Sequence, residues 1–577
     1  MRSLVLLWFA VLATAGDGGL SGIDGLLLPV SPPRSGRPMV VEVRLSSRLG
    51  AREGQAVIVL KGDEGEAARW EGPVWRVGSE PTSFRVLLPP ARSWEGYDDL
   101  RAELSWHEGA LAFPLATQLL ARAGLDVRAV AELSPAGVEL RRELVMPPHQ
   151  ADDNAQQPLR VNVVRLDPAD AASAPEAWLA WDAVLLHPQT ALPPTVREAL
   201  AAWLLAGGRL MLAPGRPGPE VGELLATLEA ARGATTPGDG STSWRAGLGL
   251  VVQDAGGDPE GVALALWGKP VAMPRWHDTY QPESDLGQLL WPEAVGRVPL
   301  TLVLVVFAAF LLWVGPVEWI VLGRLRRRRW TWITFPLAAI AATIAVTVIA
   351  RGAFGSADHV RRLVLVDCDG TGVARRCNII EQRFSGGDRM LDEQPQGELV
   401  LPIEASSGRY RGDGTAVRVR AIHRGPWHAG GSVEITLPQW TPVLLRRYSL
   451  HPPAGLPRAD FGPAPSPEAA VSGMSTLLRD GWGYAAVTPG KHEAGDARVF
   501  AGPRRQGFAS GEEVWHRIRR GLTGAVRGPL ADLASQRPYR LVARQLGTDI
   551  IVWRQELPGA APAEDSEPET EFLKGNQ

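Results

Sequence analysis

Two aspartates that stand two residues apart are the strongest candidates for chemistry in this chain. The stretch from Arg362 to Asp369 reads Arg-Leu-Val-Leu-Val-Asp-Cys-Asp, and Gly370 and Thr371 follow it. The apolar residues predict a strand, so Asp367 and Asp369 stand at its end. Two carboxylates there can act as nucleophile and general acid, and their oxygens also suit calcium. The same residues make a good turn.

This stretch resembles the first motif of haloacid-dehalogenase-type phosphatases, in which the two aspartates are the nucleophile and the general acid. That resemblance implies a helical Rossmann-like unit, a lysine and a second acidic pair that binds magnesium. Residues 372–384 instead have the pattern of a returning β-strand. We therefore predict a hairpin turn, with a calcium-stiffened turn and a phosphatase site as the alternatives.

The histidines show no catalytic or metal-binding pattern. His187 ends a predicted strand and precedes a proline, and the sequence identifies no acid partner for it. His423 and His428 lack a third ligand at the spacing that zinc sites use. We predict no catalytic residue, no cofactor or cofactor-binding residue and no metal ligand, and interpret these histidines as structural or surface residues.

Cys368 and Cys377 are the two cysteines of the chain, and they flank the predicted turn. Two cysteines exclude a disulfide scaffold and a multi-cysteine metal site. In an exported chain both would lie in an oxidising compartment, where cross-strand geometry can bring their Cα atoms within bridging range. The register of the turn decides the outcome, so a disulfide and two free thiols both stay open.

Two uncharged runs, 298–317 and 330–350, place the chain in a membrane. At about 1.5 Å per helical residue, each covers the roughly 30 Å of bilayer hydrocarbon. We predict spans over 298–322 and 330–350, joined as a tight helical hairpin in the lipid bilayer. Positive charge in a short connection indicates the cytoplasmic face and allows contact with anionic headgroups. The connection holds five arginines, namely Arg324, Arg326, Arg327, Arg328 and Arg329.

Glu318 is an acid at the end of the first predicted span. It follows Gly315 and Pro316, a pair that can kink a helix. An acid at membrane depth is a functional candidate by default. Because Glu318 stands less than two turns from Arg324, we predict an anchoring ion pair at the interface, with a proton or ion pathway as the alternative.

The N-terminus has the pattern of an export signal. Arg2 precedes an apolar stretch from Leu4 to Leu12, and Ala13 and Ala15 form a small-x-small cleavage site. Export followed by two spans predicts a two-pass protein of the bacterial cytoplasmic (inner) membrane, with both large domains extracytoplasmic. A net charge of −3 over 577 residues gives no sign of a nucleic-acid partner.

Outside the hairpin, the sequence predicts a multidomain α/β plus β protein. Short β-branched and aliphatic runs separated by Gly and Pro indicate an immunoglobulin-like β-sandwich first and a second β-rich domain after the membrane. The predicted order is 1–15 signal peptide, 16–123 β-sandwich, 124–256 α/β domain, 257–297 linker to the membrane, 298–350 transmembrane hairpin, 351–557 extracytoplasmic β-rich domain and 558–577 disordered acidic tail.

Residues 124–256 alternate between strand and helix patterns. Apolar runs at 125–131, 159–166, 183–187, 209–213 and 248–252 predict strands, and 194–206 and 220–232 predict helices. This alternation predicts a parallel sheet covered on both faces. Ser134 and Pro135 have the types that begin a further helix.

The run from Trp181 to His187, and a helix that closes in Trp203-Leu-Leu-Ala-Gly-Gly-Arg-Leu-Met-Leu-Ala213, resemble the class I glutamine amidotransferase-like, flavodoxin-type domains. The wider arrangement resembles uncharacterised bacterial envelope membrane proteins with such a domain. Amidotransferases of this family use a cysteine nucleophile on a strand-to-helix elbow, with a histidine and an acid. Residues 124–255 contain no cysteine. The resemblance therefore implies the fold and argues against the activity.

These features together predict a non-catalytic, membrane-anchored protein of the cell envelope. Large outer domains on a minimal hairpin suit an interaction or assembly platform for a membrane or periplasmic protein partner. The alternative is an exported hydrolase that uses the amidotransferase-like fold with a site assembled from its loops.

Overall fold

A computed structural model describes part of the 577-residue chain, and the architecture below concerns that part. The predicted signal peptide (except Thr14 and Ala15), most of the linker and the acidic tail lie outside it. The described residues are 14–15, 22–31, 38–62, 65–88, 99–121, 127–134, 143–146, 159–168, 171–237, 241–254, 290–292, 295, 300–326, 330–395, 397–403, 421–424, 432–451, 456, 478–479, 482–487, 539–546 and 549–556.

The N-terminal part consists of two sheets that share one apolar core. Side chains on a strand alternate between its two faces. In β3 (Met39–Ser47), alternate residues such as Val41 and Val43 are therefore fully buried between the two sheets. A three-stranded sheet has the order β2 (Ile23–Pro29), β3 (Met39–Ser47) and β6 (Thr82–Leu88). The facing sheet contains β1 (Thr14–Ala15), β8 (Leu111–Ala121), β7 (Asp99–Glu108), β4 (Arg52–Gly62) and β5 (Gly65–Val77).

The second part is an α/β domain whose five central strands are parallel, which confirms the predicted parallel sheet. Strands that are apolar on both sides suit the interior of such a sheet. The central order is β11 (Leu159–Leu166), β9 (Val127–Leu133), β12 (Ala183–Leu186), β13 (Arg209–Leu212) and β16 (Gly249–Asp254). The helical elements are η1 (Pro175–Ala180), α1 (Pro194–Leu205) and α2 (Pro219–Glu229).

The edges of this sheet differ from the prediction. Antiparallel strands that the sequence pattern did not predict extend it on both sides: β10 (Glu143–Met146) at one edge, and β15 (Ser241–Ala246) and β14 (Arg232–Pro237) at the other. The described helices η1, α1 and α2 all contribute to one hydrophobic cluster. They therefore lie on one face. Apolar residues of the opposite face, such as Val130 and Val252, are buried as well, so the sheet is covered on both faces at these positions.

The C-terminal part divides its strands between two sheets. One sheet has the order β20 (Glu398–Ile403), β23 (Pro442–Ser449), β18 (Ala374–Phe384), β17 (His359–Cys368), β27 (Asp549–Glu556), β26 (Tyr539–Leu546), β25 (Trp482–Val487) and β24 (Leu478–Arg479). The other strands, β21 (Ala421–Arg424), β22 (Ser432–Leu437) and β19 (Arg389–Glu393), join the sheet of the N-terminal sandwich.

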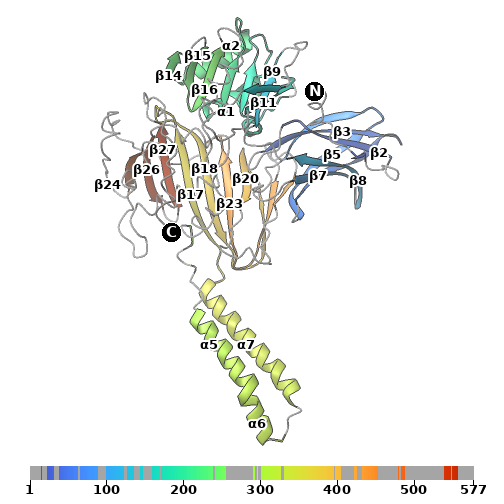
Figure 1. Ribbon diagram of the computed structural model, residues 1–577, viewed down its shortest axis with the longest axis vertical. Helices are drawn as coiled ribbons and strands as arrows, with labels where there is room; N and C mark the ends of the chain where they lie inside the picture. Colours follow the sequence, from blue (N-terminus) through green and yellow to red (C-terminus); the bar gives the residue numbers. More distant parts are fainter. Residues whose placement is uncertain are drawn as a thin grey trace.

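The connection between these parts is a parallel pairing of β21 with β5, in which Ile422 lies opposite Arg69 and Arg424 opposite Glu71. Separate β domains over 16–123 and 351–557 were predicted, but one eight-stranded sheet contains strands from both regions (Figure 1). The core of the α/β domain also includes Leu399 and Tyr448 from the C-terminal sheet. The residues before and after the hairpin therefore form one packed body.

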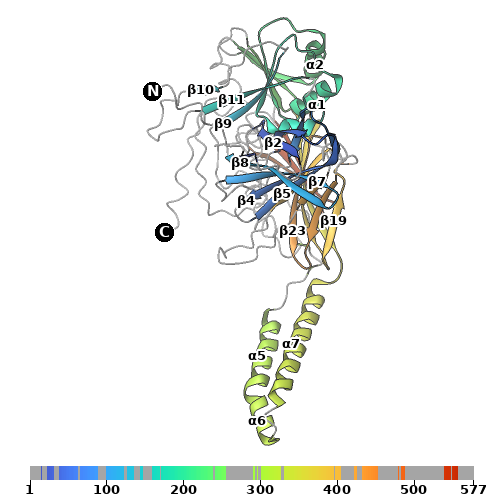
Figure 2. The same cartoon turned by 90° about the vertical axis from the view of Figure 1, so that its right-hand side faces the viewer.

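Two apolar helices project from this body as an antiparallel pair (Figures 1 and 2). Both are long and apolar enough to cross a membrane, in agreement with the predicted pair of spans. A π-helical segment contains Pro316, whose missing N–H and bulky ring disturb the regular hydrogen-bond ladder. In chain order the hairpin consists of α5 (Leu300–Leu312), the π-helical η2 (Trp313–Val317), α6 (Glu318–Arg324) and α7 (Thr331–Phe354).

Candidate functional site

Almost none of the apolar residues of the hairpin is buried within the protein. Within the apolar windows of its two helices, 6% and 0% of the residues are buried. Trp319, Trp330 and Trp332 are exposed near the turn of the hairpin, at the level where aromatic belts meet headgroups. Arg324 and Arg326 are exposed beside them, and the other three arginines, at 327–329, lie outside the described residues.

Glu318 has a different partner from the predicted one. It is 4% exposed, and its Oε1 accepts a hydrogen bond from the Thr334 hydroxyl of α7. Within the described residues Oε2 makes no hydrogen bond. The predicted ion pair with an arginine is therefore replaced by a polar contact between the two helices. Arg324, the arginine of the predicted pair, is exposed, and a long basic side chain at the end of a span can extend towards the headgroups.

An aromatic cluster at the root of the hairpin joins α7 to the C-terminal sheet. Phe354, the last residue of α7, lies 5.6 Å from Phe384 and 5.9 Å from Trp440 between ring centroids, and Trp291 lies 6.0 Å from Phe384. Trp440 has a left-handed backbone (φ 56°) and donates its amide to Ser385 O at 2.8 Å. A bulky residue rarely adopts this conformation unless its surroundings hold it there.

The Asp367–Asp369 motif forms the predicted hairpin turn between β17 and β18. Asp369 Oδ1 accepts hydrogen bonds from Thr371 N (3.0 Å), Thr371 Oγ1 (2.6 Å) and Val373 N (3.0 Å). Its other oxygen pairs with Arg375 at 2.7 Å. The carboxylate that would act as general acid, or bind calcium, is thus occupied by the turn itself.

Asp367, within β17, is held by two arginines. Arg376 and Arg554 contact its carboxylate at 2.5 and 2.7 Å. Burial raises the pKa of Asp367, but the charges of Arg554 and Arg376 outweigh burial and leave it well below the ordinary value. Arg376 also donates to Ala206 O of the α/β domain at 3.3 Å. Asp367 therefore helps to fix a contact between the two domains.

Cys368 and Cys377 are both free and buried, so the disulfide alternative is not realised in this structure. The reason is the register. Cys377 lies opposite Val366, whereas Cys368 lies opposite Ala374 beyond an irregularity in the pairing. The two thiols are diagonal neighbours within one apolar cluster, where Cα atoms stand farther apart than in directly opposed pairs.

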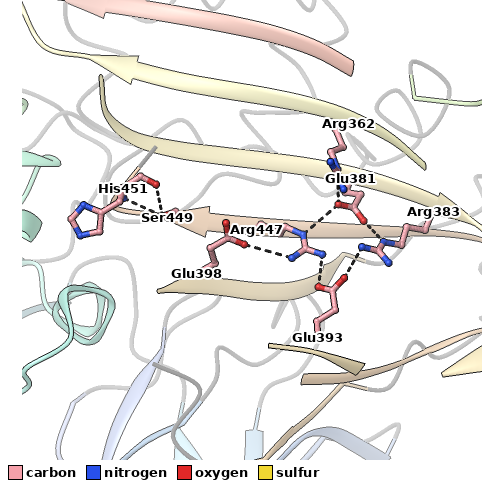
Figure 3. A network of polar contacts seen from close by, with 8 residues as sticks. All are labelled: Arg362, Glu381, Arg383, Glu393, Glu398, Arg447, Ser449 and His451. Carbon is pink, nitrogen blue, oxygen red and sulfur yellow. Dashed lines mark hydrogen bonds and ion pairs between the residues drawn. The ribbon is translucent and has the colours of Figure 1, made fainter. Parts of the chain in front are cut away.

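An ionic network joins β19, which belongs to the sheet shared with the N-terminal part, to strands of the C-terminal sheet (Figure 3). Glu381 is fully buried, with Arg362 Nε at 3.0 Å and Arg447 Nε at 3.3 Å, and it also pairs with Arg383. Glu393 bridges Arg383, at 2.6 Å, and Arg447. Burial raises the pKa of Glu381, but the charges of Arg447, Arg383 and Arg362 outweigh it and lower the pKa overall.

Glu398 completes this network through a 3.5 Å contact with Arg447. Each carboxylate of the network faces at least one guanidinium, and the arrangement spans β17, β18, β19, β20 and β23. Well-matched ion pairs of this kind fix strand register rather than expose a reactive group. We interpret the network as the structural centre of the C-terminal sheets.

At the carboxyl edge of the parallel sheet, His187 does have an acid partner. His187 Nε2 lies 2.7 Å from Glu132 Oε1; Glu132 lies near the end of β9, and His187 directly follows the neighbouring parallel strand β12. No local pattern predicts this partner, because the two residues are 55 positions apart. The signal that identifies Glu132 is an acid in a buried strand, as the last residue but one.

Ser134 lies at the same edge, immediately after β9. It is 2% exposed, and its hydroxyl has no hydrogen-bond partner among the described residues. The helix predicted to begin here lies outside the described residues. Ser134, His187 and Glu132 are the side chains at this edge with the types of a nucleophile, a base and an acid.

The remaining histidine prediction concerns His423 and His428. His423 lies on β21, where its backbone pairs with Trp70 and Val433, and position 428 is outside the described part. In the ranges that the structure describes, no three His, Cys, Asp or Glu side chains are grouped so as to hold a metal ion.

No protein-family model matches the chain, and no curated protein matches it.

Proposed function

We propose that this chain is a membrane-anchored platform of the cell envelope, which holds a large extracytoplasmic body close to the inner membrane for a membrane or periplasmic partner. The observation that carries the proposal is the exposed apolar hairpin inserted between two chain regions that share a sheet. The α/β domain, with its resemblance to amidotransferase-like domains, serves as part of the body. The fold resemblance alone carries no activity.

Sheet continuity supports a two-pass topology on physical grounds. Strands β5 and β21 precede and follow the hairpin, and their backbones are hydrogen-bonded to each other. A sheet with open edges cannot cross a bilayer, because the unpaired backbone groups at its edges would find no hydrogen-bond partner there. Both regions therefore occupy one side of the membrane if the hairpin is embedded, and the arginine-rich turn occupies the other. The positive charge of that turn favours the cytoplasm.

Cysteine labelling in intact spheroplasts tests this topology. Single cysteines introduced as Ser79→Cys and Asp392→Cys replace exposed residues on the two sides of the hairpin in the sequence. Both should react with a membrane-impermeant maleimide from outside, whereas Arg326→Cys should react only after permeabilisation. Labelling at only one of the two body positions would exclude the hairpin topology.

The partner is tested by photocrosslinking in native membranes, with a crosslinking amino acid introduced at exposed positions of the body. A platform should give one or a few discrete crosslinked bands that depend on the position of the crosslinker. A variant with the crosslinker at Trp332, inside the predicted belt, is the control for lipid-facing positions. Monomer alone at every body position would contradict the platform proposal.

A second candidate, an exported hydrolase, is favoured by the contact between Glu132 and His187, with the buried Ser134 two residues after Glu132 in the sequence. A carboxylate that orients a histidine next to a hydroxyl is the arrangement that activates a serine nucleophile. A fluorophosphonate probe applied to the purified full chain tests it. Labelling that Ser134→Ala and His187→Ala both abolish would establish the hydrolase, and an unlabelled chain beside a labelled control hydrolase would exclude it.

A further inference from the structure

Glu176 is a buried acid at the boundary between the α/β domain and the C-terminal sheet. It belongs to η1 and is 1% exposed. Its Oε1 lies 3.3 Å from the point where a Cβ on Gly397 would stand, and Gly397 directly precedes β20. Among the described residues Oε1 finds no hydrogen-bond partner. The left-handed backbone of Gly397 (φ 69°) suits glycine, and the missing side chain lets the carboxyl approach.

The charged groups around η1 are engaged elsewhere. The elements that pack against η1 are α1, β3 and the start of β20. Arg197 of α1 pairs with Glu223, Glu42 of β3 pairs with Arg44, and Glu398 of β20 pairs with Arg447. Glu198, the remaining charged residue of α1, is exposed. The boundary around Glu176 is otherwise apolar, with Trp178, Leu179 and Leu399 in one core.

We propose that Glu176 is a pH-sensitive switch for the packing of the α/β domain on the C-terminal sheet. When the carboxyl is protonated, it packs against Gly397 and the two domains close. When it ionises, the charge faces no cation among the described residues of this boundary and draws water in, which opens the contact. This proposal is independent of the function proposed above, since it concerns the packing of two domains on each other and not their attachment to a membrane or a partner.

The sign of the effect follows from the pKa of Glu176. Burial raises this pKa to about 7, and a hydrogen bond from the residue's own backbone amide lowers it by a smaller amount. In the opened contact the carboxyl returns to an ordinary pKa of about 4.3. Closure is therefore fully favoured below that value and weakens as the pH rises through about 7. Between about pH 5 and about pH 7.5, the closure equilibrium should change roughly fiftyfold.

Hydrogen–deuterium exchange of the full chain in detergent or nanodiscs measures this closure. Amides of η1 and of Glu398–Val400 should lose protection by roughly fiftyfold over that pH range, after correction for the pH dependence of chemical exchange. The neutral isostere Glu176→Gln should keep the high protection at both pH values. Glu198→Gln, a matched change on the exposed side of α1, should behave like the wild type.

Two outcomes would overturn the proposal. One is a wild-type boundary whose protection is independent of pH. The other is a pH response that persists in Glu176→Gln. Amides of β4 and β7 in the N-terminal sandwich serve as the internal reference, since they lie away from this boundary. An equal loss of protection there would indicate general destabilisation and would also contradict a local switch.

Discussion

At the scale of single residues, burial decides what the reactive side chains of the C-terminal sheet can do. Asp367, Asp369 and Glu381 all contact arginines, and the two thiols lie in an apolar cluster. The same types at the same spacing, exposed in a cleft, would be candidates for catalysis. Here Asp367 and Glu381 have partners from strands on both sides, and Asp369 has partners within its own turn and β18, so each group supports the sheet.

The two cysteines should be unreactive in the folded chain. Burial, with smaller effects from Asp367 and Asp369, raises the pKa of Cys368 to about 12, and burial likewise raises that of Cys377. Since the thiolate is the reactive form, maleimide should label neither residue under native conditions and both after unfolding. Mass spectrometry of the labelled protein, with an exposed Ser79→Cys variant as the control, measures this. Rapid native labelling would contradict the described packing.

Replacing Glu381 by glutamine should destabilise the body by about 3–5 kcal/mol, because three arginines then lose a fully buried carboxylate. Chemical denaturation of the C-terminal sheets measures the change. Asp392→Asn, an exposed substitution on β19, should stay within about 0.5 kcal/mol of the wild type. Similar small effects at both positions would show that the network contributes little to stability.

Acid should weaken the same sheets. The pKa values of Asp367 and Glu381 are lowered in the folded state, so their stabilisation is present above the ordinary carboxyl pKa of about 4 and is lost as the pH falls through the lowered values. Denaturation midpoints measured in steps below about pH 4 should fall steadily. In an Asp367→Asn variant the acid dependence should be smaller. Glu176 acts in the opposite sense at higher pH, so the two effects separate.

At the scale of elements, sequence patterns predicted individual strands and helices, which depend on neighbouring residues. The strand β11 and the start of α1 follow from apolar runs and a proline, and Val196, Leu200 and Trp203 lie on the buried face as expected. The edge strands β14 and β15 were missed because they contain few aliphatic residues. The contact between Glu132 and His187 depends on which strands are neighbours, and no local pattern states that.

Two glycines of the α/β domain give a matched pair of substitutions. A Cβ on Gly249 would stand 2.0 Å from Leu204 O, whereas a Cβ on Gly222, inside α2, meets nothing within 4 Å. Gly249→Ala should therefore destabilise the domain by more than about 1 kcal/mol, and Gly222→Ala should stabilise it by about 0.5–1 kcal/mol through helix propensity. Thermal unfolding of both variants measures this, and effects of the same sign would contradict the packing of α1 against β16.

At the scale of the whole molecule, the hairpin is an insertion into one body rather than a link between two. The sequence shows two spans with domains on either side, but it does not show that β5 and β21 pair. That pairing joins residues about 350 positions apart, and hydrophobic alternation predicts faces but not distant partners. Domain boundaries drawn from composition alone therefore divided a continuous sheet.

Cutting the chain in the turn of the hairpin should leave its two halves together. A protease site inserted after Arg326 would separate residues 1–326 from the rest, while the shared sheet and the core around Leu399 and Tyr448 stay intact. The two fragments should co-elute in mild detergent and separate only in denaturant. The uncut variant is the control, and dissociation of the fragments under native conditions would exclude the shared sheet.

The pairing of β5 with β21 also sets an order of events during synthesis. The edge of β5 around Arg69 has no β21 to pair with until Ala421 and its neighbours have been made and, if the hairpin is embedded, brought to the same side of the membrane. At about 5–20 residues per second, the intervening 350 or so residues take roughly 20–70 s. For that period the N-terminal sandwich carries an open strand edge, which other chains can join. Holdase chaperones would therefore act on the half-made protein even after its hairpin has been made, because the hairpin precedes β21 in the chain.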